Sequence, residues 1–565
     1  MTRKPRLTEE QVFLVIAVVI GVYSGISVAC FRVGIEWFRL RALGSSLVPG
    51  FPRAVLVPAT TGLAIALLVV RFFPASRGSG VNQTKAALYI YDGYISFRTV
   101  VGKFVTSALA IGSGQSLGPE DPSLQIGAGI ASALGRRLKL SRTRLRYIAP
   151  VGAAAGLAAA FNAPITAVLF VIEEVIGRWS AGVLGAVVLA AVSSVVTEEW
   201  FLGDQPLFSV PPYHLAHPSE LLAYAAMGLL GGAASLLFVM LMTTLRPRLR
   251  QMAPWTWYVQ PAIGGLLIGL IALKLPQVMG AGYEYIDQAM HDQFGWRVLV
   301  ALCIAKLLAT TISFVTGTPG GLFAPTLFIG AMLGAAVCAI ERHIAPGATG
   351  PIGAYALVGM GTMFAGTLRA PMTSVFMIIE VSHNYSIILP VMISNTIAYL
   401  VSRQFQRVAL FDRLSRQDGT DLPSMEEERE TTLHSVEDAM RSPQGVLLRS
   451  DESVDRSLAR AAQVSTEYFL APLGAGTWGG ISRAELTAVK DGGMGDRTLG
   501  SVIKAIARPY LYLDQSIEFA LGVLQERPFV PVVHRANPSQ LVGMVALDDL
   551  LRVYRSPARV EAPIE

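Results

Sequence analysis

Long apolar segments follow one another through roughly the first 400 residues, each near the length that a bilayer-spanning helix requires. Several of them are short or interrupted by Gly and Pro, which favours broken and tilted helices over simple spans. The pattern predicts an all-α polytopic membrane domain over residues 1–415. We expect its apolar spans near residues 11–30, 54–72, 98–117, 147–176, 182–197, 219–243, 260–275, 296–316, 321–342, 353–380 and 386–403.

After a polar linker, residues 416–433, the pattern changes to short strands that alternate with short helices. A similar order of elements returns after about 63 residues, which predicts two α/β units at about 434–490 and 499–556 within a module spanning 434–565. The expected strands are 445–449, 468–473, 478–482, 509–513, 529–534 and 541–546, and the expected helices are 453–464, 483–489, 516–526 and 547–555.

The apolar region contains an internal repeat. Residues 152–174 match residues 359–381 at an offset of 207, and PSLQIGA (122–128) matches PTLFIGA (325–331) at an offset of 203. The first match places Glu173 opposite Glu380. Two halves with Pro- and Gly-interrupted segments at corresponding positions are typical of transporters whose site lies between broken helices.

Composition supports a membrane protein, because only 15% of the 565 residues are charged and 52% are hydrophobic. Soluble domains carry about 25% charged residues. The net charge of +6 comes without a basic and aromatic face, so no nucleic-acid partner is expected. Cys30, Cys303 and Cys338 are scattered through apolar segments without metal-ligand spacing, so we expect packing roles and no metal site.

Candidate chemistry is concentrated in residues 112–129, GSGQSLGPEDPSLQIGAG, where Glu120 and Asp121 lie deep inside the apolar region. A carboxylate at membrane depth costs about 2.5–3.5 kcal/mol on insertion scales and is therefore functional by default. Pro119 and Pro122 fit the first turn of a helix. Free N–H groups and partial positive charge at such an end make an anion site. We hypothesise that a titratable acid there fills the site itself or leaves it for another anion.

Four motifs carry a family resemblance when taken together in this order: GSG (78–80), GPEDP (118–122), GLAAAFNAP (156–164) and GGLFAP (320–325). The chain resembles the CLC family of chloride channels and chloride/proton antiporters, followed by a pair of cystathionine-β-synthase (CBS) domains. The resemblance covers nearly the whole chain. It implies inverted repeats of broken helices and a homodimer with one pore per subunit, in a bacterial-type inner membrane with the CBS domains cytoplasmic.

The resemblance also implies roles for individual residues. Chloride would be bound by Ser79, by Gly80 and by the backbone amides of Leu322 and Phe323. Glu120 corresponds to the external gating glutamate, although the usual basic residue before it is Pro119 here and the usual Gly after it is Asp121. A second carboxylate alongside would favour the neutral form of one partner. Without the resemblance, Ser79 reads as a turn serine and Glu120 as a cap of its own helix.

The resemblance also implies roles for Glu174, Glu173 and Phe411. Glu174 corresponds to the internal proton-transfer glutamate, and Glu173 to a packing or surface residue; the alternative for both is a solvated helix-end acid. Exchangers commonly carry a tyrosine where the best local match is Phe411, which would be a purely steric gate unless the alignment slips. The charges Lys103, Lys306 and Arg369 are expected to snorkel to an interface or pair with a helix end.

In the C-terminal module, Ser482, Glu485 and Asp549 match positions that bind adenosine nucleotides in CBS pairs, whereas Ala546 replaces a hydroxyl residue. An adenine nucleotide is therefore a candidate ligand, although transport itself needs no cofactor. The alternative is a CBS pair that only dimerises and transmits strain.

Glu120 and Glu174 together favour proton-coupled chloride exchange, and the alternative is a passive chloride channel regulated by the CBS pair. The expected partners are chloride, protons, the lipid bilayer and a second copy of the chain. An enzyme is not expected, because the Glu120-Asp121 pair comes without an HExxH motif or a matched serine and lysine nucleophile. A sensor that binds nucleotide and has lost transport is a further alternative.

Overall fold

The computed structural model describes residues 8–177, 181–203, 208, 220–344, 349–406, 408–420, 422–423, 435–474, 476–513, 515–525, 527–535 and 537–555. The chain divides into two compact units, Met1–Ser424 and Met425–Glu565. The boundary falls inside the expected linker 416–433, most of which lies outside the described residues.

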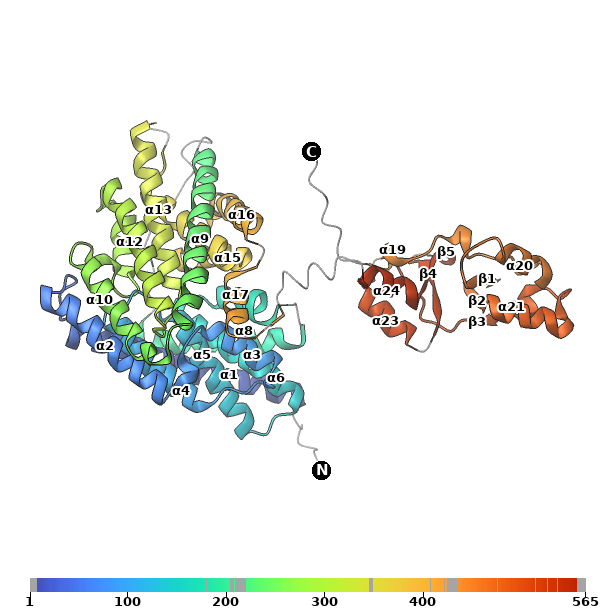
Figure 1. Ribbon diagram of the computed structural model, residues 1–565, viewed down its shortest axis with the longest axis horizontal. Coiled ribbons are helices and arrows are strands. Elements are labelled where there is room, and N and C mark those ends of the chain that lie inside the picture. Colours follow the sequence, from blue (N-terminus) through green and yellow to red (C-terminus); the bar gives the residue numbers. More distant parts are fainter. Residues whose placement is uncertain are drawn as a thin grey trace, which may run out of the picture. The chain divides into compact units, whose positions relative to one another are not determined.

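Unit 1 is a bundle of tilted helices (Figure 1). Its first half comprises α1 (Glu9–Ala42), α2 (Phe51–Arg71), η1 (Pro74–Ser76), α3 (Gly80–Tyr89), α4 (Phe97–Gly112), α5 (Glu120–Arg137), α6 (Arg142–Phe161), α7 (Pro164–Phe170), the π-helical turn η2 (Val171–Ile176) and α8 (Ala181–Leu202). Its second half comprises α9 (Glu220–Arg250), η3 (Pro254–Tyr258), α10 (Gln260–Ala272), η4 (Pro276–Val278), α11 (Tyr283–Met290), α12 (Trp296–Val315), α13 (Phe323–Ile344), α14 (Ile352–Leu368), α15 (Pro371–Ser382), η5 (Tyr385–Ile387) and α16 (Ile388–Phe405), followed by α17 (Leu410–Gln417).

Two of the expected spans are each broken into two helices. The segment 147–176 is interrupted where Asn162 adopts a left-handed conformation with φ of 52°, and Pro164 then starts α7. The segment 353–380 is interrupted in the same way at Arg369, with φ of 60°, before Pro371 starts α15. Seven helices of the described residues are long and apolar enough to cross a membrane, and shorter apolar helices lie between them.

The two halves contact each other reciprocally. Glu173 accepts hydrogen bonds from the backbone N–H groups of Met372 and Thr373 at the start of α15, at 3.3 and 2.9 Å. Its counterpart Glu380 accepts from Ile165 and Thr166 at the start of α7, at 2.8 and 2.6 Å. Reciprocal contacts of this kind are what a two-fold relation generates. The repeat predicted from the sequence is therefore present as a local two-fold in unit 1.

Where the two halves meet, a backbone pair repeats this relation. Gly118 and Gly321 exchange two N–H to C=O hydrogen bonds, each 2.8 Å long. These glycines directly precede the starts of α5 and α13, so the first turns of both helices are brought together. Any anion site built from these helix ends therefore lies at the contact between the halves.

Unit 2 is an α/β unit with two antiparallel sheets (Figure 1). Strands β1 (Tyr468–Gly474), β2 (Thr477–Ser482) and β3 (Lys504–Ala505) form one sheet, and β4 (Phe529–His534) and β5 (Asn537–Ala546) form the other. Its helices are α19 (Val436–Ala439), η6 (Pro443–Gly445), α20 (Val454–Ala461), α21 (Arg483–Val489), η7 (Lys490–Met494), α22 (Leu499–Val502), α23 (Ile517–Leu524) and α24 (Leu547–Arg555).

Two strand predictions for unit 2 were wrong. Residues 445–449 and 509–513 each contribute a single parallel bridge, Leu447 to Leu470 and Leu511 to Val532, rather than a strand. The first follows directly on the η6 turn, and the second begins with Pro509, which has no N–H to donate to a ladder. The other expected strands and helices are present with boundaries that differ by a few residues, and β3 was not expected.

Candidate anion and proton site

The start of α3 presents a cluster of hydrogen-bond donors. Gly78 has a φ of 89°, which only glycine adopts readily, and turns the chain so that Ser79 caps the helix. The Ser79 hydroxyl accepts from the Val81 N–H at 3.2 Å. Ser79 is buried, yet it also lines a cavity of about 520 Å³ together with polar side chains that include Arg77, Asn82, Gln83 and Arg250. The predicted chloride ligand thus lies at the wall of a cavity with both polar and apolar lining.

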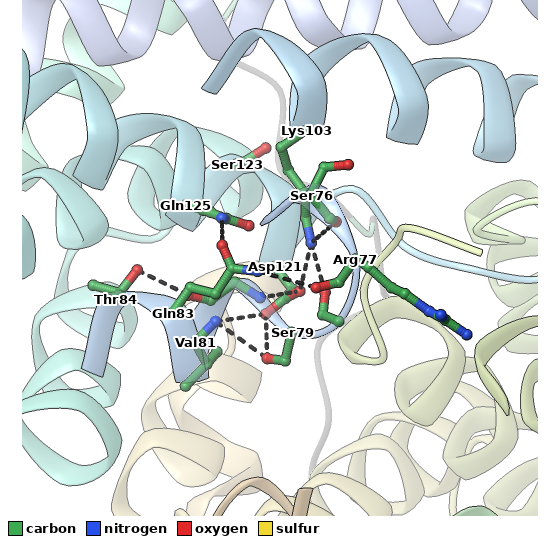
Figure 2. Close-up of polar contacts among 12 residues, drawn as sticks. Ser76, Arg77, Ser79, Val81, Gln83, Thr84, Lys103, Asp121, Ser123 and Gln125 are labelled. Carbon is green, nitrogen blue, oxygen red and sulfur yellow. Dashed lines mark hydrogen bonds and ion pairs between the residues drawn. The ribbon is translucent and has the colours of Figure 1, made fainter. Parts of the chain in front are cut away.

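The donors at the start of α3 are bound to a carboxylate of the protein itself (Figure 2). Asp121 Oδ1 accepts from the Ser79 hydroxyl and from the Val81 N–H, both at 3.0 Å, and Oδ2 accepts from the Gly80 N–H at 2.9 Å. Lys103 Nζ lies 4.0 Å from Oδ2. The residue that departs from the family pattern therefore occupies the position expected for chloride at Ser79 and Gly80.

Glu120 points to the other half of the protein. It is the first residue of α5 and is fully buried. Its Oε2 accepts from the Ala324 N–H, in the first turn of α13, at 3.3 Å, and its Oε1 accepts from the Tyr283 hydroxyl. Leu322 and Phe323 lie at the same helix start. The structure thus places Glu120 beside the backbone amides expected to bind chloride, with contacts that reach beyond its own helix.

Aromatic rings surround Phe323. Its ring centroid lies 5.0 Å from that of Phe170, 5.6 Å from Phe364, 6.0 Å from Phe161 and 6.2 Å from Phe411. The Asn82 side chain of α3 donates to the Phe411 carbonyl at 2.9 Å, which ties α17 to the start of α3. Phe411 is therefore adjacent to Phe323, as its predicted position requires, and without a hydroxyl it can only fill space there.

Glu174 belongs to a buried charge cluster. Lys85 Nζ on α3 lies 3.6 Å from Glu174 Oε1 and 2.8 Å from Asp412 Oδ1 on α17. All three side chains are buried, so neither the solvated helix-end interpretation of Glu174 nor that of Glu173 holds. Glu173 instead caps α15, where the Thr373 hydroxyl also donates to it at 2.6 Å. Two neighbouring acids thus have different environments, one a cap and one an ion pair.

Lys103 and Lys306 are fully buried, so they do not snorkel to an interface. The alternative expectation, pairing with a helix end, fits both, because Ser76 and Val278 are the last residues of η1 and η4. Lys103 donates to the carbonyls of Ser76 and Gly78 at 3.3 and 2.7 Å, and Lys306 donates to those of Val278 and Gly280 at 3.0 and 2.7 Å. Irregular loops before α3 and α11 leave carbonyls without helical partners, and unsatisfied carbonyls are costly at membrane depth. Each lysine therefore holds one of two equivalent loops.

Arg369, the third of these charges, is also buried. Its guanidinium donates to the Ser402 carbonyl of α16 at 3.3 Å, so the alternative of pairing with a helix end fits this residue.

Sequence reasoning missed Asp121 as a ligand, and it also missed Lys85, Asp412 and Tyr283. The sequence contained a signal for Lys85, which interrupts an otherwise uncharged helix. It also contained a signal for the role of Lys103 and Lys306, which are separated by the repeat offset of 203 and so lie at equivalent positions of the two halves. Tyr283, at the start of α11, carries no comparable signal, since a tyrosine in an apolar region is ordinary.

The residues expected to bind nucleotide in unit 2 make contacts within the unit. Ser482 and Glu485 form a reciprocal capping box at the start of α21, with the Ser482 N–H and hydroxyl both 2.8 Å from Glu485 Oε2. Asp549 is buried and accepts from the Arg441 guanidinium at 2.8–2.9 Å and from the Ala546 N–H at 3.1 Å. Both acids thus have protein partners in the structure.

Residues 61–403 match the family model described as "Voltage gated chloride channel". An H(+)/Cl(-) exchange transporter ClcA of Yersinia pseudotuberculosis is 31% identical over 404 residues, which cover 69% of this chain and 84% of the relative. A putative chloride channel protein ClcB-like of Ralstonia nicotianae is 30% identical over 426 residues, 73% of this chain and 99% of the relative.

Solved structures agree with this match. A slow cyanobacterial Cl-/H+ antiporter has a TM-score of 0.66 at 25% identity, covering 73% of this chain and 99% of that one. A eukaryotic CLC transporter has a TM-score of 0.63 at 22% identity, covering 95% of this chain and 97% of that one. The second likeness concerns the fold alone, and it extends over both units.

Proposed function

The chain belongs to the voltage-gated chloride channel, or CLC, family, and we propose that it exchanges chloride for protons across the membrane. The observation that carries the proposal is the position of Glu120, a fully buried carboxylate that accepts from the first turn of α13. A relative whose printed name is H(+)/Cl(-) exchange transporter adds support.

Chloride would be held at the start of α13 by the backbone amides of Leu322 and Phe323. These groups offset the cost of desolvation with partial charges rather than with a full positive charge, so the ion can also leave. Glu120 would bind there as a carboxylate. After taking a proton it would leave the helix start and admit chloride, which links proton movement to anion movement.

The proton would reach the opposite side through Glu174. Lys85 offsets one of the two negative charges that Glu174 and Asp412 would carry, which lowers the cost of burying two acids side by side. Phe411 would act as a steric barrier next to Phe323 on the anion path. The proton path through Glu174 and the anion path past Phe411 would then separate near α3 and α17.

The test uses purified protein in liposomes loaded with chloride, with external pH followed while the chloride gradient runs down. We expect uphill proton movement in the natural protein. Glu120→Gln and Glu174→Gln should each abolish proton movement, whereas chloride flux continues. Chloride flux without any proton movement in the natural protein would contradict the proposal.

That contrary result would establish the alternative, a passive chloride channel. Two observations favour this alternative: the relative named as a putative chloride channel, and the ion pair that binds Glu174 to Lys85. In a channel, Glu174→Gln would alter stability without altering the ratio of protons to chloride, which would be zero throughout. A sensor without transport would show neither flux.

The same proposal includes assembly and location. We propose a homodimer in a bacterial-type inner membrane, with unit 2 on the cytoplasmic side together with the basic segments 136–146 and 246–250. Cross-linking in native membranes would report the dimer, and protease access to unit 2 in inverted vesicles would report its side.

Adenine nucleotide binding by unit 2 stays a prediction. A nucleotide could bind these acids only if Glu485 left its capping box or Asp549 left Arg441. We therefore expect weaker binding than at a site whose acids have no partners within the protein. Calorimetric titration of the purified chain with ATP, compared with Asp549→Ala, would test it; equal heats in both proteins would contradict binding at Asp549.

A further inference from the structure

Asp121 is bound in the manner of an anionic ligand. It is 2% exposed, and its two oxygens accept from one hydroxyl and two backbone N–H groups at 2.9–3.0 Å (Figure 2). A lysine ammonium lies 4.0 Å away and supplies the opposite charge. Hydroxyl, amides and a nearby cation are the groups that would hold a dehydrated chloride.

The folding of α3 does not depend on this carboxylate. Ser79 already caps the helix by accepting from the Val81 N–H, and Lys103 already binds the carbonyls of Ser76 and Gly78. If Asp121 left, the helix would keep its cap and the lysine its partners. The Gly80 N–H and the Ser79 hydroxyl would then lack an acceptor, and the lysine charge would lack its counter-charge; an anion from the adjoining cavity of about 520 Å³ could satisfy all three.

Both anion positions of the protein thus hold a tethered carboxylate. Glu120 occupies the start of α13 in the second half, and Asp121 occupies the start of α3 in the first half. We propose that Asp121 is a second gating carboxylate, which chloride entering from the cavity must displace from Ser79. The inference rests on the proposed function in that the competing anion is chloride.

The test is an equilibrium binding measurement on the full-length protein in detergent. Chloride is titrated by calorimetry into the natural protein, into Asp121→Gly, which empties the position, and into Asp121→Asn, which keeps the size without the charge. We expect a dissociation constant at least tenfold lower in Asp121→Gly, with Asp121→Asn in between. Binding within twofold of the natural protein in both variants would overturn the proposal.

Ser79→Ala provides the matched control. With Asp121 absent, loss of the hydroxyl should weaken chloride binding about fivefold or more. With Asp121 present, the hydroxyl is already taken, so the same change should alter binding less than twofold. Equal effects in the two backgrounds would mean that Asp121 and chloride do not compete for Ser79.

A bromide-soaked crystal of the natural protein covers the case in which the Asp121 variants do not fold. We expect anomalous density beside Ser79 only at bromide concentrations at which Asp121 has left Ser79 and Gly80. Density within hydrogen-bond reach of the Ser79 hydroxyl while Asp121 keeps those contacts, or no density there at any bromide concentration that the crystal tolerates, would overturn the proposal. None of these measurements involves transport. The proposal for Asp121 can therefore be supported even if the protein shows no coupled flux, and it can be contradicted even if the protein is an exchanger.

Discussion

Adjacent residues at a helix start can bind different partners. Successive positions on an α-helix are turned by about 100°, so Glu120 and Asp121 diverge to α13 and α3 and each finds its own donors. The sequence indicated that a second carboxylate alongside would favour the neutral form of one partner. The separate donors show that the two acids do not share a site, and the neutral form of one of them stays a prediction.

Tyr283→Phe tests how firmly Glu120 is held. The change removes the hydroxyl that donates to Oε1 and leaves the ring in place. A hydrogen bond to a charged group contributes about 1.5–3 kcal/mol, so chloride should replace Glu120 more easily and the half-saturating chloride concentration for flux should fall about tenfold. Proton coupling should persist. An unchanged concentration dependence would mean that the hydroxyl does not hold the closed form.

Lys85→Met tests the buried cluster around Glu174. Removing one partner of a buried ion pair typically costs about 3–5 kcal/mol, because the remaining charges are uncompensated. We expect a strongly lowered thermal unfolding midpoint, measured by scanning fluorimetry. The double change Lys85→Met with Asp412→Asn should recover part of the loss, since one buried charge is removed with the cation. A double variant less stable than the single one would contradict this charge balance.

The motifs predicted where the site lies but not its contacts. Ser79, Glu120 and Phe323 could be placed from short motifs, because each is positioned by its own helix start. Lys85 meets Asp412 across 327 residues of sequence, and such a pairing has no local pattern from which to infer it. Asp121 was recognisable as unusual, whereas its ligands depended on how the two halves pack.

At the scale of elements, each half caps a helix of the other. Glu173 and Glu380 lie at equivalent positions and bind equivalent helix starts. Loss of such a cap costs about 0.5–2 kcal/mol. Glu173→Gln and Glu380→Gln should therefore lower the thermal midpoint by similar amounts and leave the proton-to-chloride ratio unchanged.

Glu174→Gln is the contrasting variant for this prediction, since it differs from Glu173→Gln by one position. It should abolish coupling, whereas the capping variants only destabilise. Loss of coupling in Glu173→Gln with an intact protein would mean that the two neighbouring acids share one role.

The start of α5 followed from the sequence at Pro119 and Pro122. The expected spans 147–176 and 353–380, in contrast, ran through Pro164 and Pro371, where α7 and α15 begin. Predictions also failed where an element is defined by pairing alone. Leu447 and Leu511 lie in apolar runs that resemble strands. An apolar run forms a strand only if a neighbouring segment pairs with it over several residues, and here each run forms a single bridge.

The capping box of α21 makes part of unit 2 sensitive to acid. Hydrogen bonds from the Ser482 N–H and hydroxyl hold the pKa of Glu485 below its usual value. A carboxylate with a lowered folded pKa stabilises fully above its unfolded pKa, about 4.3, and loses that effect as pH falls through the folded value. Amide exchange in α21 should therefore accelerate relative to α24 at acid pH, and Glu485→Gln should remove this difference. An acceleration that persists in Glu485→Gln would contradict it.

At the scale of the whole molecule, unit 1 contains every residue assigned to chloride or proton movement. The matched region of this chain covers 99% of the Ralstonia relative and 99% of the cyanobacterial antiporter structure while leaving about a quarter of this chain unmatched. A complete fold of this kind therefore exists without a counterpart of unit 2.

A chain ending at Ser424 should consequently fold and transport. Its packed helices and both tethered carboxylates are retained, so we expect chloride flux in liposomes with the same proton-to-chloride ratio as the full chain. The rate per protein is the quantity that unit 2 can alter, because a regulatory unit changes how often the path opens and not which groups carry the ions. A monodisperse truncated protein that moves chloride without protons would show that coupling extends beyond unit 1, and one without any flux would show that unit 2 is required to keep the path competent.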